Sequence, residues 1–177
     1  MNIRMVLKSL GIVIMFEGLC MIPSLLVSMI YHEDDAVSFV ISILITAAAG
    51  LLLYKIPIRN SKFYERDGYA VVALSWIAIS LFGAFPFIIS NTVPSFIDAF
   101  FETVSGFTTT GSTILKEIES LPRGILFWRS FTNWLGGMGV LVLTLAVLPS
   151  VSAGSLHIMK AEATGPSAEK LVPKLGQ

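Results

Sequence analysis

The chain has 177 residues, of which 54% are hydrophobic and only 14% are charged. Soluble domains carry about 25% charged residues, so this composition excludes an ordinary soluble globular protein and predicts one that is solvated by lipid. The formal net charge of zero gives no indication of a nucleic-acid partner, and the single cysteine, Cys20, excludes an internal disulfide bond.

Four apolar segments are long enough to cross a bilayer core about 30 Å thick, which takes about 20 helical residues. They run over residues 6–30, 37–54, 69–90 and 125–149. The first is too long for a signal-peptide core, so we interpret it as a true span. Pro23 should kink this span, and Pro86 should mark the last regular turn of the third.

Two of these segments contain residues that are unusual in a membrane span: an acid in the first and a glycine-rich motif in the fourth. Glu17 is the only acid in the first two, where a charge usually faces protein or water. It is either a functional group or, the interpretation we favour, a structural hydrogen-bond partner for a neighbouring helix. In the fourth segment, Gly136-Gly137-Met138-Gly139 predicts a close helix–helix contact, because small residues let backbones approach.

The basic residues predict an orientation in the membrane. The loop over residues 31–35 has three acids and no lysine or arginine. Nine of the 12 basic residues lie at the N-terminus, in the second loop and in the tail, and they are Arg4, Lys8, Lys55, Arg59, Lys62, Arg66, Lys160, Lys170 and Lys174. By the positive-inside rule, these parts and both termini are cytoplasmic, and the protein is a multi-pass membrane protein.

Residues 96–107, between the third and fourth segments, predict a short helix. Their apolar residues recur with a helical period, Ser95 is a plausible N-cap, and Asp98 lies near the positive end of the helix dipole. The helix is too short to span a bilayer and too apolar for an exposed loop. A helix that enters the membrane only halfway satisfies both facts. Asp98 and Arg129 are also candidate ion-pair partners.

The polar stretch Thr108-Thr109-Thr110-Gly111-Ser112-Thr113 follows this helix. Non-helical backbone is tolerated at membrane depth only where protein buries it or where it lines a water-filled path. An extended strand returning outward presents carbonyls that can replace the hydration shell of a monovalent cation, and Gly111 allows dihedrals that other residues avoid. The alternative is an ordinary extracellular loop rich in threonine and glycine.

Three stretches of the sequence resemble one known family. They are Ser105 to Thr113, Phe127 to Gly139, and the tail residues Lys160 to Pro166 with Lys170 to Lys174. In these motifs the chain is similar to the TrkH/TrkG/KtrB potassium uptake proteins, and the two spans before the pore unit make it TrkH-like.

The resemblance implies an all-α integral membrane fold with four transmembrane helices, one re-entrant pore helix and a filter loop. It further implies potassium ion binding by filter carbonyls of Thr109, Thr110, Gly111 and Ser112, with Thr108 and Asp98 as candidate filter support. The family implies a bacterial inner-membrane location, a cytoplasmic nucleotide-binding regulatory subunit and a dimer of the full-length protein. We expect potassium to move down its electrochemical gradient or by symport with another ion, and we expect no catalysis.

The chain departs from the family in holding one pore loop rather than four. We expect two N-terminal helices and a cytoplasmic loop over residues 1–67, a helix–pore loop–helix repeat over 68–150, and a cytoplasmic tail over 151–177. One strand cannot close a filter, so we expect an N-terminal fragment of a longer transporter, completed by three further repeats, rather than four assembled copies. The alternative function is a non-conducting membrane scaffold or an inactive truncated product.

Overall fold

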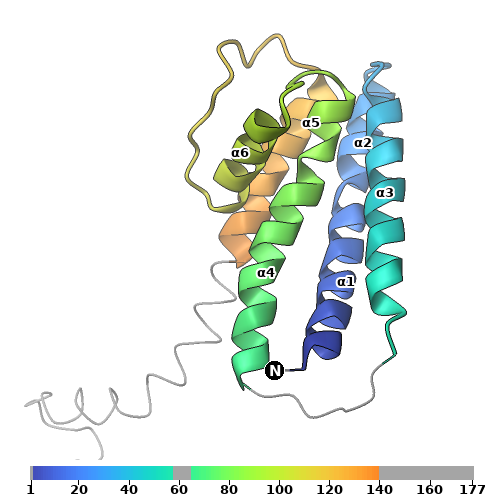
Figure 1. Cartoon of the computed structure of the whole chain (residues 1–177). Helices are drawn as coiled ribbons and strands as arrows, with labels where there is room; N and C mark the ends of the chain where they lie inside the picture. The colour runs from blue at the N-terminus through green and yellow to red at the C-terminus, as the bar shows by residue number, and fades with distance from the viewer. Residues whose placement is uncertain (1, 58–64, 140–177) are drawn as a thin grey trace, which may run out of the picture. The chain divides into compact units, whose positions relative to one another are not determined.

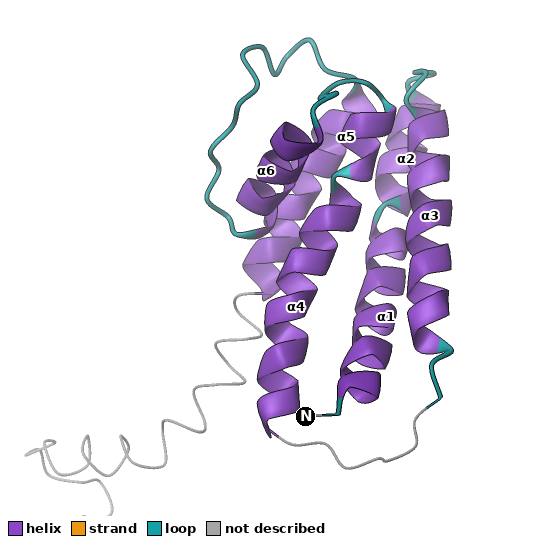
Figure 2. Cartoon of the chain, viewed as in Figure 1, coloured by secondary structure: helices purple, strands orange, loops and turns teal. Residues whose placement is uncertain are grey.

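The computed structural model describes residues 2–57 and 65–139, and every regular element within these ranges is a helix (Figure 2). Three of the described helical stretches are long and apolar enough to cross a membrane: Ile3–Ile30, Ala36–Tyr54 and Arg66–Ile89. They correspond to the first three predicted spans. Of the fourth, residues 123–139 form a helix, whereas residues 140–149 and the predicted tail lie outside the described residues.

The first span consists of two helices, α1 (Ile3–Cys20) and α2 (Ile22–Ile30), which follow one another along the same line (Figure 1). They are separated at Met21, and Pro23 lies in the first turn of α2. Proline is tolerated there because the first turn of a helix has no internal partner for its missing N–H. The span is therefore interrupted next to Pro23, as the proline suggested, but its two helices continue along one line rather than at the expected kink.

The second span, α3 (Ala36–Tyr54), returns alongside α1 and α2 (Figure 1). Four small residues at a spacing of four are buried on one face of α3, namely Ser38, Ser42, Thr46 and Gly50. A Cβ atom added to Gly50 would lie 2.6 Å from Cγ of Met15, and one added to Gly11 would lie 2.7 Å from the Gly50 carbonyl oxygen. Small residues therefore bring these two backbones together, as they do in many membrane helix pairs.

The third span comprises α4 (Glu65–Gly83) and the short α5 (Phe85–Ile89). The two are separated at Ala84, and Pro86 lies in the first turn of α5. Because α5 ends three residues after Pro86, the proline marks the last turns of the span, as predicted. Ala84, Pro86 and Phe87 are buried, and Ala84 and Phe87 belong to the hydrophobic core that also contains Ala99 and Phe107.

The loop between α2 and α3 contacts the start of the helix over residues 123–139. The Glu33 carboxylate accepts hydrogen bonds from the backbone N–H groups of Arg123, at 2.6 Å, and Gly124, at 3.4 Å. Nearby, the Ser28 hydroxyl donates a hydrogen bond to Asp35. An acidic side chain at a helix N-terminus satisfies N–H groups that lack internal partners and interacts favourably with the helix dipole. Glu33 thus caps a helix that begins 90 residues later in the sequence.

We expect Glu33→Ala to lower the free energy of unfolding by about 1–2 kcal/mol, the usual range for losing a helix cap. Thermal unfolding of the purified chain in detergent measures this difference. Asp34→Ala is the matched control, since Asp34 is in the same loop, carries the same charge and is exposed. Equal losses in the two variants would show that loop charge, rather than the cap, is responsible.

Candidate functional site

The short helix α6 (Phe96–Phe107) has the predicted bounds. Ser95 is the N-cap residue with extended backbone angles, although its side chain makes no capping hydrogen bond, and Asp98 lies in the first turn. Helix α6 packs against α4 and α5 and lies beside the helix over residues 123–139 (Figure 1). Its apolar period and local caps therefore gave a correct prediction of where this element begins and ends.

Glycines on two neighbouring helices allow α6 to approach closely. A Cβ atom on Gly83 of α4 would lie 2.7 Å from Cγ2 of Thr103. A Cβ atom on Gly136 would overlap the carbonyl group of Phe107, at the last turn of α6. This contact confirms, at Gly136, the close helix packing predicted for the Gly136-Gly137-Met138-Gly139 motif.

Trp128 anchors the same region from the core. Its side chain is fully buried, its ring lies edge-on to that of Phe107 with centroids 6.4 Å apart, and its Nε1–H donates a 2.9 Å hydrogen bond to the Gly83 carbonyl. A buried indole N–H normally finds such a partner. Trp128 thereby links α4, the end of α6 and its own helix.

The backbone after α6 turns sharply through two residues with positive φ. Thr109 has φ +58° and Gly111 has φ +75°. The Thr110 N–H donates to the Ser105 carbonyl at 3.0 Å, and the Thr109 N–H donates to Gly106 at 2.9 Å. Glycine adopts positive φ without strain, as expected at Gly111, but a β-branched residue such as Thr109 does so only when its surroundings impose it.

The predicted ion-binding residues Thr109, Thr110, Gly111 and Ser112 form one exposed, non-helical segment with Thr108. The hydroxyl groups of Thr108 and Thr110 are hydrogen-bonded at 2.8 Å, and the Thr109 hydroxyl donates to the Thr108 carbonyl. The Ser112 carbonyl accepts a 2.6 Å hydrogen bond from the Ser105 hydroxyl, which occupies one of its two lone pairs. We refer to residues 108–113 as the filter segment.

The structure separates Asp98 from this segment. Asp98 is exposed in the first turn of α6, whereas the filter segment follows the last turn. Arg129, which the sequence offered as a partner for Asp98, instead forms an ion pair with Glu102, with Arg129 Nε 2.6 Å from Glu102 Oε1. Two acids one turn apart on α6 thus occupy different environments, and only the second is buried.

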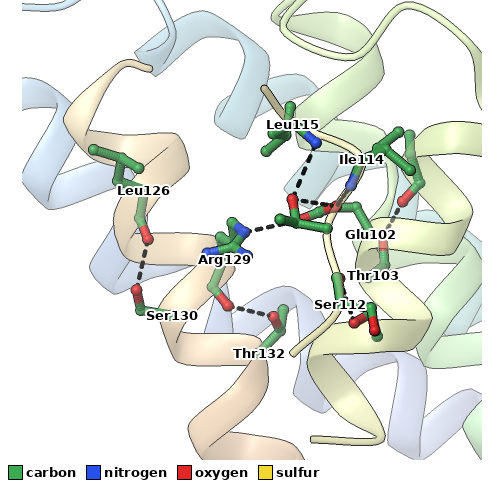
Figure 3. A network of polar contacts seen from close by, with 12 residues as sticks. Glu102, Thr103, Ser112, Ile114, Leu115, Leu126, Arg129, Ser130 and Thr132 are labelled. Carbon is green, nitrogen blue, oxygen red and sulfur yellow. Dashed lines mark hydrogen bonds and ion pairs between the residues drawn. The ribbon is translucent and has the colours of Figure 1, made fainter. Parts of the chain in front are cut away.

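Glu102 is the centre of a polar network that our sequence analysis did not identify (Figure 3). Its carboxylate is 3% exposed and accepts hydrogen bonds from the Thr113 hydroxyl at 2.9 and 3.0 Å and from the Ile114 N–H at 3.3 Å. Arg129 approaches from the next helix. Glu102 lies on the face of α6 opposite its large apolar residues, and the structure buries that face together with Ala99 and Ser105. The apolar period therefore gave no signal for it.

A cavity of about 150 Å³ lies between the filter segment, α6 and the helix over residues 123–139. Its lining includes Glu102, Ser105, Gly111, Ser112, Arg129 and Asn133. Because these walls are polar, the cavity has the character of a site for ordered water rather than of a dry apolar void. The filter segment is therefore held to the protein by hydrogen bonds more than by apolar packing.

Glu17 does not join this network. Its side chain is 3% exposed, and neither carboxylate oxygen has a hydrogen-bond partner among the described residues. A Cβ atom on Gly83 would lie 2.9 Å from Glu17 Oε1, so the carboxyl group is in contact with α4 beside α6. The hydrogen bond to a neighbouring helix that we expected of Glu17 is absent from the described part of the chain.

Comparison with known proteins gives consistent matches. Residues 35–175 match the TrkH family model, described as a cation transport protein. The chain is 37% identical over 179 residues to the Trk system potassium uptake protein TrkH of Halomonas elongata, covering 99% of this chain and 37% of that protein. It is 36% identical over 177 residues to the Trk system potassium uptake protein TrkG of Escherichia coli, covering 98% of this chain and 36% of that protein.

Among solved structures, the chain is similar to the crystal structure of the potassium transporter TrkH from Vibrio parahaemolyticus. The TM-score is 0.78 at 31% sequence identity, and the match covers 90% of this chain and 37% of that one. The chain thus spans a little over a third of the length of the relatives that it matches.

Proposed function

Because the chain belongs to the TrkH family of cation transport proteins, a family of transporters rather than enzymes, we propose that it serves potassium uptake across the bacterial inner membrane. In this proposal the filter segment supplies one strand of a potassium selectivity filter. The observation that carries it is the half-length helix α6, which ends in an exposed turn with positive φ at Thr109 and Gly111. Such backbone geometry is typical of a segment that presents carbonyl groups to a ligand.

The electrostatics of α6 favour a cation at the filter segment. The C-terminus of a helix carries the negative end of its dipole, and α6 ends at Phe107, directly before Thr108. Dehydrating a potassium ion requires oxygens that replace its water ligands. We assign this role to the carbonyl groups of Thr109, Thr110, Gly111 and Ser112, with the hydrogen-bonded hydroxyl of Thr108 as local support.

A complete filter needs strands around the whole ion, and this chain supplies one. In our proposal the other strands come from further repeats of a longer transporter, or from other copies of the chain. Residues 1–67 would form the N-terminal helix pair and its loop. Residues 68–150 would form the helix–pore loop–helix repeat, whose second helix would cross the membrane at 125–149. Residues 151–177 would form the tail. Both termini would be cytoplasmic, next to a nucleotide-binding regulatory subunit, and the full transporter would be a dimer.

Rubidium uptake into liposomes tests the proposal. One preparation contains the 177-residue chain alone, and the other contains the assembled transporter, meaning this chain joined to the later repeats of its own transporter or of the Halomonas relative. We expect rubidium uptake, with rubidium favoured over sodium, only in the assembled transporter, since one strand cannot enclose an ion. An assembled, correctly folded transporter without rubidium flux would favour a non-conducting scaffold.

A further inference from the structure

We propose that Glu102 is the positioning residue of the filter segment, and that Arg129 holds its carboxylate in place. This inference rests on the proposed function and makes the ion selectivity of the strand depend on two side chains that are not among the proposed ion ligands. Glu102 lies on α6, Arg129 lies on the next helix, and the segment that they hold leaves α6 and returns past both (Figure 3).

The first step concerns what the Glu102 carboxylate binds. It accepts hydrogen bonds from the Thr113 hydroxyl and the Ile114 N–H, which are the first groups beyond the proposed ion-facing residues. The Ser105 hydroxyl, one turn further along α6, donates to the Ser112 carbonyl. Three consecutive residues of the returning backbone, Ser112 to Ile114, are thus attached to α6 by two side chains.

The second step concerns what else holds the filter segment. Residues 108–114 are exposed, a Cβ atom at Gly111 would meet nothing within 4 Å, and the polar cavity lies behind Gly111 and Ser112. Apolar packing therefore does not fix the position of this backbone. Thr109 is in addition held at φ +58°, a conformation that persists only when surrounding contacts impose it. At Thr109 these contacts are the backbone hydrogen bonds from the Thr109 N–H to Gly106 and from the Thr110 N–H to Ser105. Beyond Gly111, the segment is held by the hydrogen bonds from the Ser105 hydroxyl and to the Glu102 carboxylate.

The third step concerns the charge on Glu102. A carboxylate that is 3% exposed is stable as an anion only with a counter-charge and several hydrogen bonds. Arg129 Nε supplies the positive charge at 2.6 Å, and Thr113 and Ile114 supply further donors. Hydrogen bonds to a charged acceptor are about twice as strong as neutral ones, so the ion pair strengthens the attachment of the loop. Removing the charge at Glu102 weakens both contacts together.

Two roles of the Glu102–Arg129 ion pair can be distinguished by reversing its charges: joining α6 to the next helix, and holding the returning loop in position. An ion pair that only joins α6 to the next helix works in either polarity. A loop anchor requires the acceptor to be on α6, because the Thr113 hydroxyl and the Ile114 N–H are donors. The double substitution Glu102→Arg with Arg129→Glu restores the pair of charges but leaves these two donors facing a cation.

The experiment measures the ratio of rubidium to sodium uptake in the assembled transporter, and hydrogen exchange of the Ile114 amide in the 177-residue chain. We expect Glu102→Gln to lower the uptake ratio and to speed the exchange at Ile114, each by about tenfold, the size expected for weakening a hydrogen bond to a charged group. The charge-reversed double variant should remain as defective as Glu102→Gln. Recovery of the uptake ratio in the double variant would overturn the proposal.

A second pair of variants leaves the ion pair intact and so decides the matter if Glu102→Gln does not fold. Thr113→Val removes the hydroxyl while keeping the branched shape, and Thr113→Ser keeps the hydroxyl. We expect Thr113→Val to lower the uptake ratio several-fold and Thr113→Ser to preserve it. Equal ratios in these two variants would overturn the proposal.

Failure of the proposed function and failure of this inference give different results. If the unsubstituted assembled transporter shows no preference for rubidium, the proposed function fails. Unchanged hydrogen exchange at Ile114 in Glu102→Gln would instead refute the role of Glu102 in holding the loop.

Discussion

Gly136→Ala should separate the helix over residues 123–139 from α6 and abolish rubidium uptake by the assembled transporter. A Cβ atom at position 136 would overlap the Phe107 carbonyl oxygen and lie 2.6 Å from the carbonyl carbon and 2.8 Å from Cα of Phe107. These are backbone atoms, so no side-chain rotation relieves the overlap. Overpacking of a tight core costs about 1–3 kcal/mol even when side chains adjust, and a clash with backbone belongs at or above the upper end of that range.

Gly137→Ala is the matched control for this prediction. The nearest atom to a Cβ at position 137 is Cγ2 of Thr109, at 3.8 Å, which is an ordinary van der Waals distance. We expect the stability of this variant to lie within about 0.5 kcal/mol of the original chain, as is usual for substitutions that meet no obstacle. Thermal unfolding of the 177-residue chain and rubidium uptake by the assembled transporter measure the two effects. Similar losses in both variants would contradict the packing argument.

Close contacts at glycines also fix the position of α6 against its neighbouring helices. Gly83 on α4 leaves room for the Thr103 side chain, and Gly136 leaves room for the backbone of Phe107. Gly106 on α6 itself faces Thr132, whose Cβ would lie 3.2 Å from an added Cβ. Glycines on three helices thus set the depth of α6, and the depth of α6 in turn sets where the filter segment begins.

Local sequence signals were sufficient to predict α6. Its apolar period and the acid at Asp98 lie within the helix itself and the N-cap Ser95 lies directly before it, and the resulting bounds agree with the structure. The first three spans were predictable for the same reason, because their length and apolar character are local properties. Positive φ at Gly111 was likewise expected from the residue type.

The partners of the charged residues could not be predicted in this way. Asp98 and Glu102 lie one turn apart on α6, and which of them meets Arg129 depends on how deeply α6 sits and how it is rotated. Those quantities are fixed by contacts between residues far apart in sequence. Glu33 illustrates the same limit, since it caps a helix that begins 90 residues later.

The backbone at Thr109 was also beyond local reasoning. Threonine is branched at Cβ and avoids positive φ, so the residue type argues against the conformation that the structure shows. Strained backbone of this kind is concentrated at functional sites, where surrounding contacts impose it. At Thr109 these contacts are the two backbone hydrogen bonds that close the last turn of α6, from Thr109 to Gly106 and from Thr110 to Ser105.

Substitution of Gly111 should weaken ion selectivity in an order that follows backbone preference rather than side-chain size. At φ +75°, a residue with a Cβ atom is strained by about 1–2 kcal/mol, although nothing lies within 4 Å of where that Cβ would be. The cost therefore comes from the dihedral angle. It should appear as a change in how the carbonyl groups of the filter segment point toward the ion.

Three variants of Gly111 in the assembled transporter show whether backbone preference or side-chain size determines the loss of selectivity. Asparagine tolerates positive φ better than serine, and valine tolerates it least, although asparagine is larger than serine. We expect Gly111→Ser to lower the ratio of rubidium to sodium uptake by about tenfold, corresponding to about 1.4 kcal/mol, with Gly111→Asn less affected and Gly111→Val more affected. A larger loss for asparagine than for serine would mean that other repeats crowd this position in the assembled filter. Unchanged selectivity in all three variants would refute the assignment of Gly111 to the filter. Glycine is the residue that fits positive φ at this position without strain. A strand whose backbone carbonyls bind the ion cannot lose that residue without a change in selectivity.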